Sequence, residues 1–125
     1  MGVPIRVLLA DDSEQMRRAV CSLLGDEENI TVCGEARDYP ELLSKLGECD
    51  ADVALMDLRM PGAGKIDAAT VKARFHHACL LAMSFAKDPE TTSLAQSLGA
   101  FKLLDKMELA RTLIPAIHEC VRLRQ

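Results

Sequence analysis

The sequence predicts an α/β fold in which a five-stranded parallel sheet is covered by helices on both faces, in a (βα)5 order. Short apolar runs alternate with stretches of helical periodicity, which is the pattern of a parallel sheet. The runs are almost wholly apolar, as expected of strands that are buried on both faces. A length of 125 residues, 49% hydrophobic and 27% charged, is typical of one globular domain. We therefore expect residues 1–125 to form a single domain.

The first half of the chain contains three of the expected strands. Ile5–Ala10 is the first, and apolar residues at helical spacing follow it. Ile30–Ala36 is the second, and Pro40 suits the first turn of a short helix after it. Asp52–Asp57 is the third strand and leads directly into the turn signal Met60-Pro-Gly62.

The next segment is predicted to be a weak helix followed by a strand and a well-capped helix. Residues 66–75 have weak helical character, and Ala78–Ser84 reads as the fourth strand. Asp88 is then expected to cap a helix that has Pro89 at its first position and ends at Gly99.

The chain closes with a short strand and a long helix. Phe101–Asp105 is the expected fifth strand, and the helix after it carries Leu113, Ile117 and Cys120 on one face. Pro115 should lie in the first turn of this helix or else kink it.

The cysteine pattern and the charge exclude several classes of protein. The odd number of cysteines, their wide spacing and the lack of a Cys-x-x-Cys pair argue against a disulfide framework or a zinc site. We expect buried free thiols in a reducing compartment for all of them: Cys21, Cys33, Cys49, Cys79 and Cys120. A net charge of −4 gives no electrostatic reason to bind nucleic acid or an acidic membrane. With no signal-peptide pattern and no run near the roughly 20 apolar residues of a membrane span, we expect a cytoplasmic protein.

Polar residues follow four of the predicted strands, at the edge where an open parallel sheet binds its ligands. The first strand ends in Asp11-Asp12, the third in Asp57 and the fourth in Ser84, and Lys106 lies just after the fifth. The sequence therefore predicts that three carboxylates, a hydroxyl and an amine converge.

This set of groups is suited to phosphoryl chemistry with a metal ion. Crowded carboxylates repel one another, and Mg²⁺ relieves the repulsion with oxygen ligands, among which the backbone carbonyl of Arg59 is a further candidate. One carboxylate can then attack phosphorus as a nucleophile. An ammonium such as that of Lys106 would neutralise the phosphoryl oxygens, and Ser84 can donate a hydrogen bond to one of them.

Each of these residues also has an ordinary structural interpretation when taken alone. Asp12 could cap the first helix, with Gln15 completing a capping box. Asp57 and Ser84 could be turn residues, and Lys106 a solvated surface lysine. The joint occurrence of these residues at successive strand ends favours the chemical interpretation.

Four segments give the chain a specific resemblance to the receiver domain of two-component response regulators. The resemblance extends along essentially the whole chain, and the segments that carry it are Val7-Leu-Leu-Ala-Asp-Asp-Ser13, Ala54-Leu-Met-Asp-Leu-Arg-Met-Pro-Gly62, Leu81-Ala-Met-Ser84 and Gly99-Ala-Phe-Lys-Leu-Leu-Asp-Lys106. It implies a flavodoxin-like, doubly wound fold. It also implies that Asp57 is the phosphoacceptor, that Asp11 and Asp12 surround Mg²⁺, and that Ser84 and Lys106 are the switch hydroxyl and the phosphate-binding lysine.

The resemblance further implies a signalling role rather than an enzyme. Phosphoryl groups would come from a histidine kinase or a histidine phosphotransfer protein, and the resulting switch would control an output domain or a partner. A homodimer and a DNA-binding output domain outside this chain stay open, as does the choice between a stand-alone receiver and a piece of a longer regulator. The chain itself is not expected to contact nucleic acid or a membrane.

The sequence departs from the family pattern at the switch position. Leu103 stands where the family usually has Tyr or Phe, and Met107 follows Lys106 where Pro is frequent. Phe101, two residues before Leu103, is expected on the same side of the strand and could supply aromatic surface there. Phe85, next to Ser84, is a second candidate for reporting movement of the hydroxyl.

Two rival functions fit the same fold. An aspartate-nucleophile phosphatase would require an Asp-x-Asp motif, whereas Asp11 and Asp12 are adjacent and Leu58 and Arg59 follow Asp57. A phosphate-independent interaction module would not require the complete set of acceptor residues. Turnover of a phosphate ester would favour the first rival, and failure to take up phosphate with Mg²⁺ present would favour the second.

Overall fold

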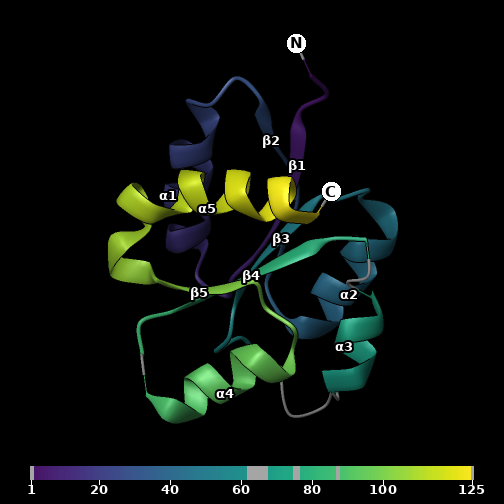
Figure 1. Cartoon of the computed structure of the whole chain (residues 1–125), viewed down its shortest axis with the longest axis vertical. Helices are drawn as coiled ribbons and strands as arrows, with labels where there is room; N and C mark the ends of the chain where they lie inside the picture. Colours follow the sequence, from purple (N-terminus) through teal and green to yellow (C-terminus); the bar gives the residue numbers. More distant parts are fainter. Residues whose placement is uncertain (1, 62–67, 75–76, 87, 125) are drawn as a thin grey trace.

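The computed structural model describes residues 2–61, 68–74, 77–86 and 88–124. A five-stranded sheet forms the centre of the molecule, with the strand order β2-β1-β3-β4-β5 and parallel pairing throughout (Figure 1). The strands are β1 (Ile5–Ala10), β2 (Ile30–Ala36), β3 (Val53–Asp57), β4 (Cys79–Ser84) and β5 (Lys102–Asp105). The predicted parallel α/β sheet is confirmed.

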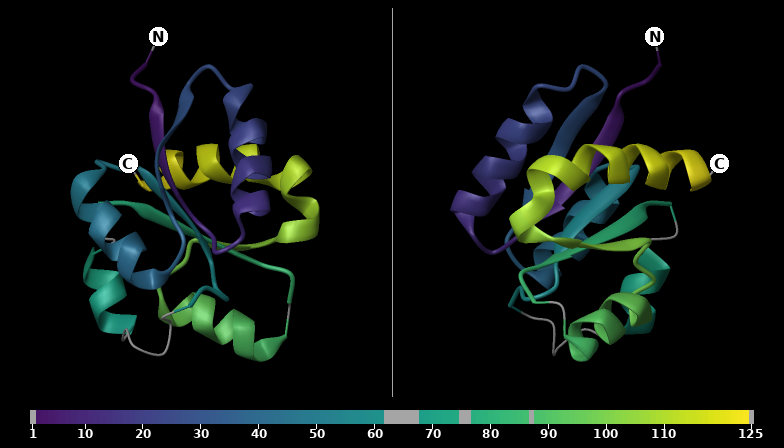
Figure 2. Two further views of the ribbon diagram at one scale, coloured as in Figure 1. Left: turned by 180° about the vertical axis from the view of Figure 1, so that it is seen from behind. Right: turned by 60° about the vertical axis from the view of Figure 1, so that its left-hand side comes forward.

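Helices cover both faces of this sheet (Figure 2). α1 and α5 lie on one face, and α2, α3 and α4 lie on the other. The helices are α1 (Glu14–Gly25), α2 (Tyr39–Glu48), α3 (Ala68–Arg74), α4 (Pro89–Ser97) and α5 (Leu109–Arg124), and a 3₁₀ turn over Lys106–Glu108 precedes α5. No helix among the described residues is long and apolar enough to cross a membrane.

Alternating side chains along the strands divide the core into two clusters. Leu8 and Ala54 belong to the cluster beneath α2 and α4, whereas Val7 and Leu55 belong to the cluster beneath α1 and α5. Successive residues of a strand point to opposite faces, so a strand buried on both sides must be apolar at every position. This is why the predicted strands read as unbroken apolar runs.

The strand boundaries agree with the sequence pattern to within one residue, which is inside the usual uncertainty of such assignments. Pro40 lies in the first turn of α2, and the Asp88 carboxylate caps α4 by accepting a hydrogen bond from the Thr91 N–H at 2.8 Å. Gly99 ends the helical segment with a φ of 79°, a conformation that favours glycine. Of the weakly helical stretch 66–75, only α3 is described, and Gly62 of the predicted turn is also outside the described residues.

The cap of α1 is Ser13, so the capping interpretation of Asp12 is wrong. The Ser13 hydroxyl accepts a hydrogen bond from the Met16 N–H at 3.1 Å. Asp12 is one residue too early to cap this helix, and its side chain is exposed. The Asp12 carboxylate is therefore left free for another role.

Pro115 lies inside α5, so the first of the two expectations, a place in the first turn of the helix, is wrong. The helix begins earlier than expected because the 3₁₀ turn, capped by the Asp105 carboxylate, leads directly into it at Leu109. Proline there removes one helical hydrogen bond. Burial of Leu113 and Ile117 on the same helix favours the helical path in spite of that loss.

The expectation of five buried free thiols is also wrong. Cys79 at the start of β4 and Cys120 in α5 form a disulfide, with their Cα atoms 6.1 Å apart. These residues are far apart in sequence, and only the packing of α5 across the sheet brings their side chains together. The other cysteines, Cys21, Cys33 and Cys49, are free but only partly buried.

Candidate functional site: an acidic pocket at the carboxyl edge of the sheet

Three carboxylates meet at the carboxyl ends of two neighbouring strands. Asp11 and Asp12 follow β1, and Asp57 is the last residue of β3. The parallel register pairs Ala10 with Met56, so the residues after them end on the same edge of the sheet. Asp11, Asp12 and Asp57 each contribute a carboxylate oxygen, and these oxygens all lie within 4.8 Å of one another. The predicted convergence of the acidic residues is therefore present.

Lys106 supplies the positive charge at this pocket. Its Nζ lies 2.8 Å from Asp11 Oδ2 and 3.2 Å from Asp57 Oδ2, and its side chain is only 6% exposed. Lys106 lies at this edge of the sheet because β5 ends at Asp105 beside β4 and Lys106 begins the 3₁₀ turn that follows. The two carboxylates explain why a cation lies at the start of a helical segment, where the backbone dipoles disfavour one.

The Asp57 carboxylate is buried, and its surroundings have opposing effects on its pKa. Burial raises the pKa of Asp57 above its ordinary value, and the nearby charge of Asp11 acts in the same direction. The Arg59 N–H, which donates to Asp57 Oδ1 at 2.9 Å, and the Lys106 ammonium lower the pKa of Asp57 in opposition. These donors hold the carboxylate in one orientation with its oxygens facing the pocket.

The donor set fits a magnesium ion. Asp11 Oδ1 accepts a hydrogen bond from the Ser13 N–H at 2.9 Å, whereas the buried Oδ2 forms no hydrogen bond among the described residues and has only the ionic contact with Lys106. A buried carboxylate oxygen that lacks a hydrogen bond is stabilised by a nearby cation. Mg²⁺ prefers hard oxygen ligands such as carboxylates. The cluster of Asp11, Asp12 and Asp57 is therefore a candidate site for a divalent cation.

Ser84 and Phe85 form the wall of the pocket at the end of β4. Ser84 is buried, and its hydroxyl accepts a hydrogen bond from the Ala86 N–H at 3.0 Å. Phe85 is 63% exposed, and the Lys106 Nζ lies 5.2 Å from the centre of its ring. The sequence reasoning named Phe85 as a reporter of the Ser84 hydroxyl but missed its contact with Lys106, because Phe85 follows β4 and Lys106 follows β5, far apart in the sequence.

Arg17 is a residue of this region that the sequence reasoning did not find. Its Nη1 donates to the backbone carbonyl of Asp11 at 2.7 Å, and its Nε lies 3.1 Å from the Glu35 carboxylate. The guanidinium thereby ties the loop that carries the acidic pair to the end of β2. The helical pattern gives no signal for this role, because Arg17 reads as one of several charged residues on α1.

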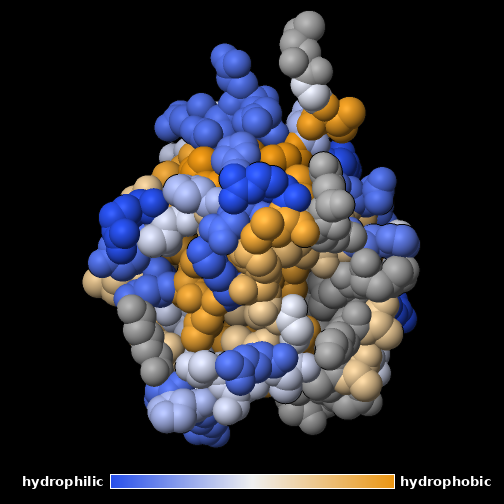
Figure 3. Space-filling model, in the orientation of Figure 1, coloured by the Kyte–Doolittle hydropathy of each residue, from blue (hydrophilic) through white to orange (hydrophobic). Residues whose placement is uncertain are grey.

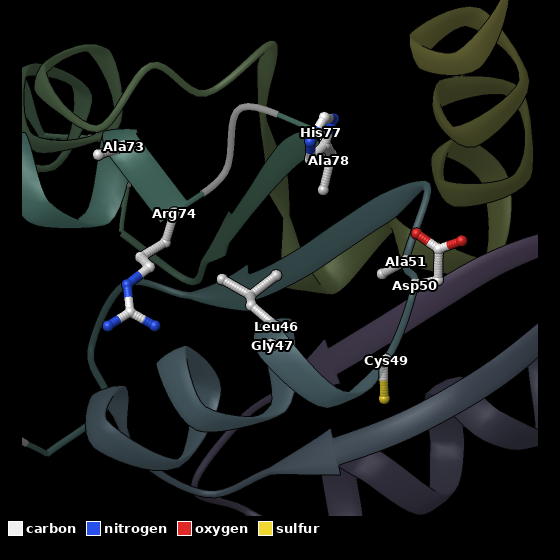
Figure 4. A pocket seen from close by; sticks show the side chains of 9 residues that line it. All are labelled: Leu46, Gly47, Cys49, Asp50, Ala51, Ala73, Arg74, His77 and Ala78. Atoms are coloured by element: carbon white, nitrogen blue, oxygen red, sulfur yellow. The ribbon is translucent and has the colours of Figure 1, made fainter.

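The pocket is an open hollow of about 540 Å³. Among the described residues, nine line it: Asp11, Asp12, Ser13, Asp57, Arg59, Ser84, Phe85, Ala86 and Lys106. A second hollow of about 230 Å³ lies at the opposite edge of the sheet, where α2 and α3 lead into the starts of β3 and β4 (Figure 4). None of the acidic residues described above lines that second hollow, so the site predicted from the strand ends corresponds to the first.

Leu103 and Phe101 pack on opposite faces of the sheet, which corrects the prediction that they share one. Leu103 is half-buried against the cluster that contains Ala95 and Leu98, whereas Phe101 packs against the cluster beneath α5. Residue 101 is in a bend before β5 begins at Lys102, so the alternation of a strand does not extend to it. Phe101 therefore supplies no aromatic surface beside Leu103.

The fold and the pocket together define a class of parallel α/β protein with an acidic set opposite a lysine at the carboxyl edge of the sheet. The family described as response regulator receiver domain matches residues 7–118. The chain belongs to this family, which serves two-component systems, and its general phosphoacceptor role follows from that membership.

Several relatives and solved structures resemble the chain closely. The response regulator GacA of Pseudomonas protegens is 34% identical over 116 residues, covering 91% of this chain and 54% of that protein. A protein-glutamate methylesterase/protein-glutamine glutaminase of Pyrococcus abyssi is 32% identical over 107 residues, covering 84% of this chain and 29% of that protein. The signal receiver domain of NarL from Mycobacterium tuberculosis superposes with a TM-score of 0.86 at 29% identity, covering 97% of this chain and 98% of that one.

The chain spans only part of these curated relatives, from 19% to 54% of the length of the first ones that it matches. The receiver domain of Thermotoga maritima CheB, at 23% identity and a TM-score of 0.81, shares the fold. The matches therefore describe the receiver portion and leave the activities of the longer proteins with those proteins.

Proposed function

We propose that residues 1–125 act as one receiver domain that accepts a phosphoryl group on Asp57. The observation that carries the proposal is the position of the Asp57 carboxylate, which is buried at the floor of an open hollow, where the Lys106 ammonium bridges it to Asp11. A nucleophile needs exposure to its donor and compensation of the charge that gathers on phosphorus. The pocket offers both.

Transfer is written as a displacement at phosphorus. An oxygen of the Asp57 carboxylate forms the new O–P bond, and the P–N bond to the donor imidazole breaks, its electron pair leaving with the imidazole nitrogen. Before transfer the Lys106 ammonium contacts Asp11 and Asp57. It is close enough to turn toward the phosphoryl oxygens as their charge develops. Ser84 lines the same hollow, and its hydroxyl would donate a hydrogen bond to the transferred group.

Asp11, Asp12, Asp57 and the backbone carbonyl of Arg59 would hold Mg²⁺. Asp12 has an exposed carboxylate that no hydrogen bond or ion pair engages within the described part of the chain, so it has the most freedom to bind directly. The bound ion neutralises the crowded carboxylates and the phosphoryl oxygens.

The donor we propose is the phosphohistidine of a histidine kinase or of a histidine phosphotransfer protein. The chain itself would act as acceptor and switch without turning over a substrate. Its partner would be an output domain or a separate protein, in keeping with the longer response regulators among its relatives.

The test is to treat the protein with phosphoramidate, which carries a P–N bond, in the presence of Mg²⁺. Intact-mass spectrometry should show a single phosphoryl adduct that is absent without Mg²⁺ and in the Asp57→Asn variant. Asp105→Asn is the matched control, because Asp105 is also a carboxylate at a strand end and its capping oxygen is retained by asparagine.

Each contrary result points to a different function. Equal adduct in Asp57→Asn would place the acceptor elsewhere. Absence of any adduct on the native protein, with either phosphoramidate or a phosphohistidine protein as donor, would favour a phosphate-independent interaction module. Continuous hydrolysis of a phosphate ester would favour an aspartate-nucleophile phosphatase.

A further inference from the structure

The Phe85 ring lies at the mouth of the acidic pocket without being part of the core. Phe85 is 63% exposed, although it follows the buried Ser84 directly in the chain. Large aromatic side chains gain most from burial, so one that stays in water at the rim of a site has its position set by something other than core packing.

The contact that fixes the ring is with Lys106. The ammonium contacts the carboxylates of Asp11 and Asp57, and the Phe85 ring centre lies 5.2 Å from its Nζ. Lys106 keeps only 6% of its side chain exposed, although it lies in an open hollow. An attraction of this kind at an exposed site shifts an equilibrium by about two- to fivefold.

We propose that Phe85 is a positioning residue that, held by Lys106, covers one side of the phosphoryl site and slows the access of water and small phosphodonors to it. The inference rests on the proposed phosphorylation of Asp57. Because Asp57 is at the floor of the hollow, a phosphoryl group on it must extend toward the mouth, where the ring lies.

The shielded reaction is hydrolysis of the acyl phosphate. The oxygen of a water molecule forms a bond to phosphorus, the bond from phosphorus to the Asp57 oxygen breaks, and its electron pair returns to the carboxylate. Inorganic phosphate leaves and the water proton passes to solvent. The attacking oxygen must enter opposite the carboxylate, that is, from the mouth.

The same ring discriminates between donors. A small donor offers no surface with which to displace the ring, whereas a protein that docks over the pocket can move a side chain that is largely exposed. Phe85 thereby favours transfer from a phosphohistidine protein over transfer from a small acyl phosphate.

The experiment compares Phe85→Ala, Phe85→Leu and Phe85→Tyr with the native protein. Each is loaded with phosphoramidate and Mg²⁺ and desalted, and the remaining adduct is followed by intact-mass spectrometry. Phe85→Ala should lose its phosphoryl group about two- to fivefold faster and take it up faster from acetyl phosphate by a similar factor. Phe85→Tyr should keep the native rates, and Phe85→Leu, which has bulk but no ring face, should behave like alanine.

Met107→Ala is the matched control. Met107 is 77% exposed and adjacent to Lys106 in sequence, but it does not line the pocket, so its removal should leave both rates native. Melting temperatures of all variants should agree, because neither side chain is buried.

The outcomes separate this inference from the proposed function. If the native protein and Phe85→Ala both take up the phosphoryl group, and do so and lose it at equal rates, the shielding role alone is overturned. Native rates in Phe85→Leu would overturn the role of the Lys106 contact. Lack of an adduct on every variant would overturn the phosphorylation of Asp57, and the shielding role with it.

Discussion

Lys106 bridges two buried carboxylates, and this contact governs the electrostatics of the pocket at the scale of single residues. Its ammonium lies against Asp11 Oδ2 and Asp57 Oδ2, where it offsets the repulsion between the two acids. Asp12 is outside this arrangement, with its side chain exposed. Asp11 and Asp12, although adjacent in the chain, therefore lie in different electrostatic environments.

We predict that Asp12→Ala abolishes Mg²⁺ binding more thoroughly than Asp11→Ala. The Asp11 oxygens are already engaged by the Ser13 N–H and by Lys106, so Asp11 is expected to act as an outer partner. Loss of such a partner weakens a metal site by about 10- to 100-fold, whereas loss of a direct ligand should leave no measurable binding. Isothermal titration with Mg²⁺ decides between them. Equal or reversed losses would contradict the assignment.

Tyr39 offers a pH-dependent test of the same region. It is the only tyrosine, it is buried, and its hydroxyl donates to the Leu58 carbonyl at 3.3 Å. Burial, followed by the charge of Asp57, raises its pKa to about 12. In the unfolded chain the tyrosine hydroxyl loses its proton near the ordinary pKa of tyrosine, whereas in the folded protein it retains the proton at that pH. The stabilisation is therefore complete below about pH 10 and is lost as the pH rises toward about 12.

We predict that Tyr39→Phe removes this alkaline loss of stability. Urea unfolding at neutral pH and at about pH 11 should show a fall of about 1 kcal/mol in the native protein that the variant lacks. At neutral pH the variant should be less stable by about 1 kcal/mol, because the Leu58 carbonyl loses its hydrogen bond. Tyrosinate absorbance checks the pKa directly. A titration near pH 10 in the folded protein would contradict the prediction.

At the scale of secondary-structure elements, the disulfide joins α5 to the sheet. Cys79 is at the start of β4, and Cys120 lies beyond Pro115 in α5. The proline interrupts the hydrogen bonds of the helix, and the crosslink anchors the portion that follows. Burial of Leu113 and Ile117 secures the portion around the proline.

We predict that reduction of this disulfide destabilises the protein by about 3 to 4 kcal/mol. The two cysteines are 41 residues apart, and a loop of that size removes this much chain entropy from the unfolded state. The measurement is urea unfolding with and without reductant. A Cys79→Ala/Cys120→Ala variant is the control. Its remaining cysteines, Cys21, Cys33 and Cys49, are already free thiols, so the reductant should not change its free energy of unfolding. An equal response of both proteins would argue against the crosslink.

At the scale of the whole molecule, the pocket and the α4–β5–α5 side of the fold are linked through β4 and β5. Figure 3 shows apolar surface between α4 and α5, in the region where Figure 1 places these strands. Leu103 on β5 packs toward Ala95 and Leu98, whereas Phe101 faces the other core cluster. Leu103 has neither an aromatic ring nor a hydroxyl. Its side chain therefore does little to favour one packing of this region over another.

We predict that Leu103→Tyr enlarges the response of this side to a phosphoryl mimic. A ligand shifts an equilibrium only by its different affinity for two states, and leucine gives two packings that differ little in free energy. Hydrogen exchange of α4, β5 and α5 amides, with and without beryllofluoride and Mg²⁺, should change less in the native protein than in the variant. Leu103→Met, which changes shape without adding a ring, is the control. A native response as large as that of Leu103→Tyr would show that leucine suffices as the switch residue.

The sequence by itself determined the elements, their order and the edge that carries the acidic residues. Hydrophobic periodicity is a local property, so the strands β1 to β5 could be located from it. Parallel connection then requires every strand to end on one edge, which is why Asp11, Asp57 and Ser84 could be assigned to one site before any contact was known.

The tertiary structure alone decided which side chains touch. Ser13 and not Asp12 caps α1, and Phe101 turns away from Leu103, because a single residue's shift at the end of an element changes where its side chain points. The Cys79–Cys120 disulfide and the contact of Phe85 with Lys106 join residues on different elements. Such pairs depend on how α5 and β5 pack against the sheet, and periodicity along the chain contains no information about distances across it.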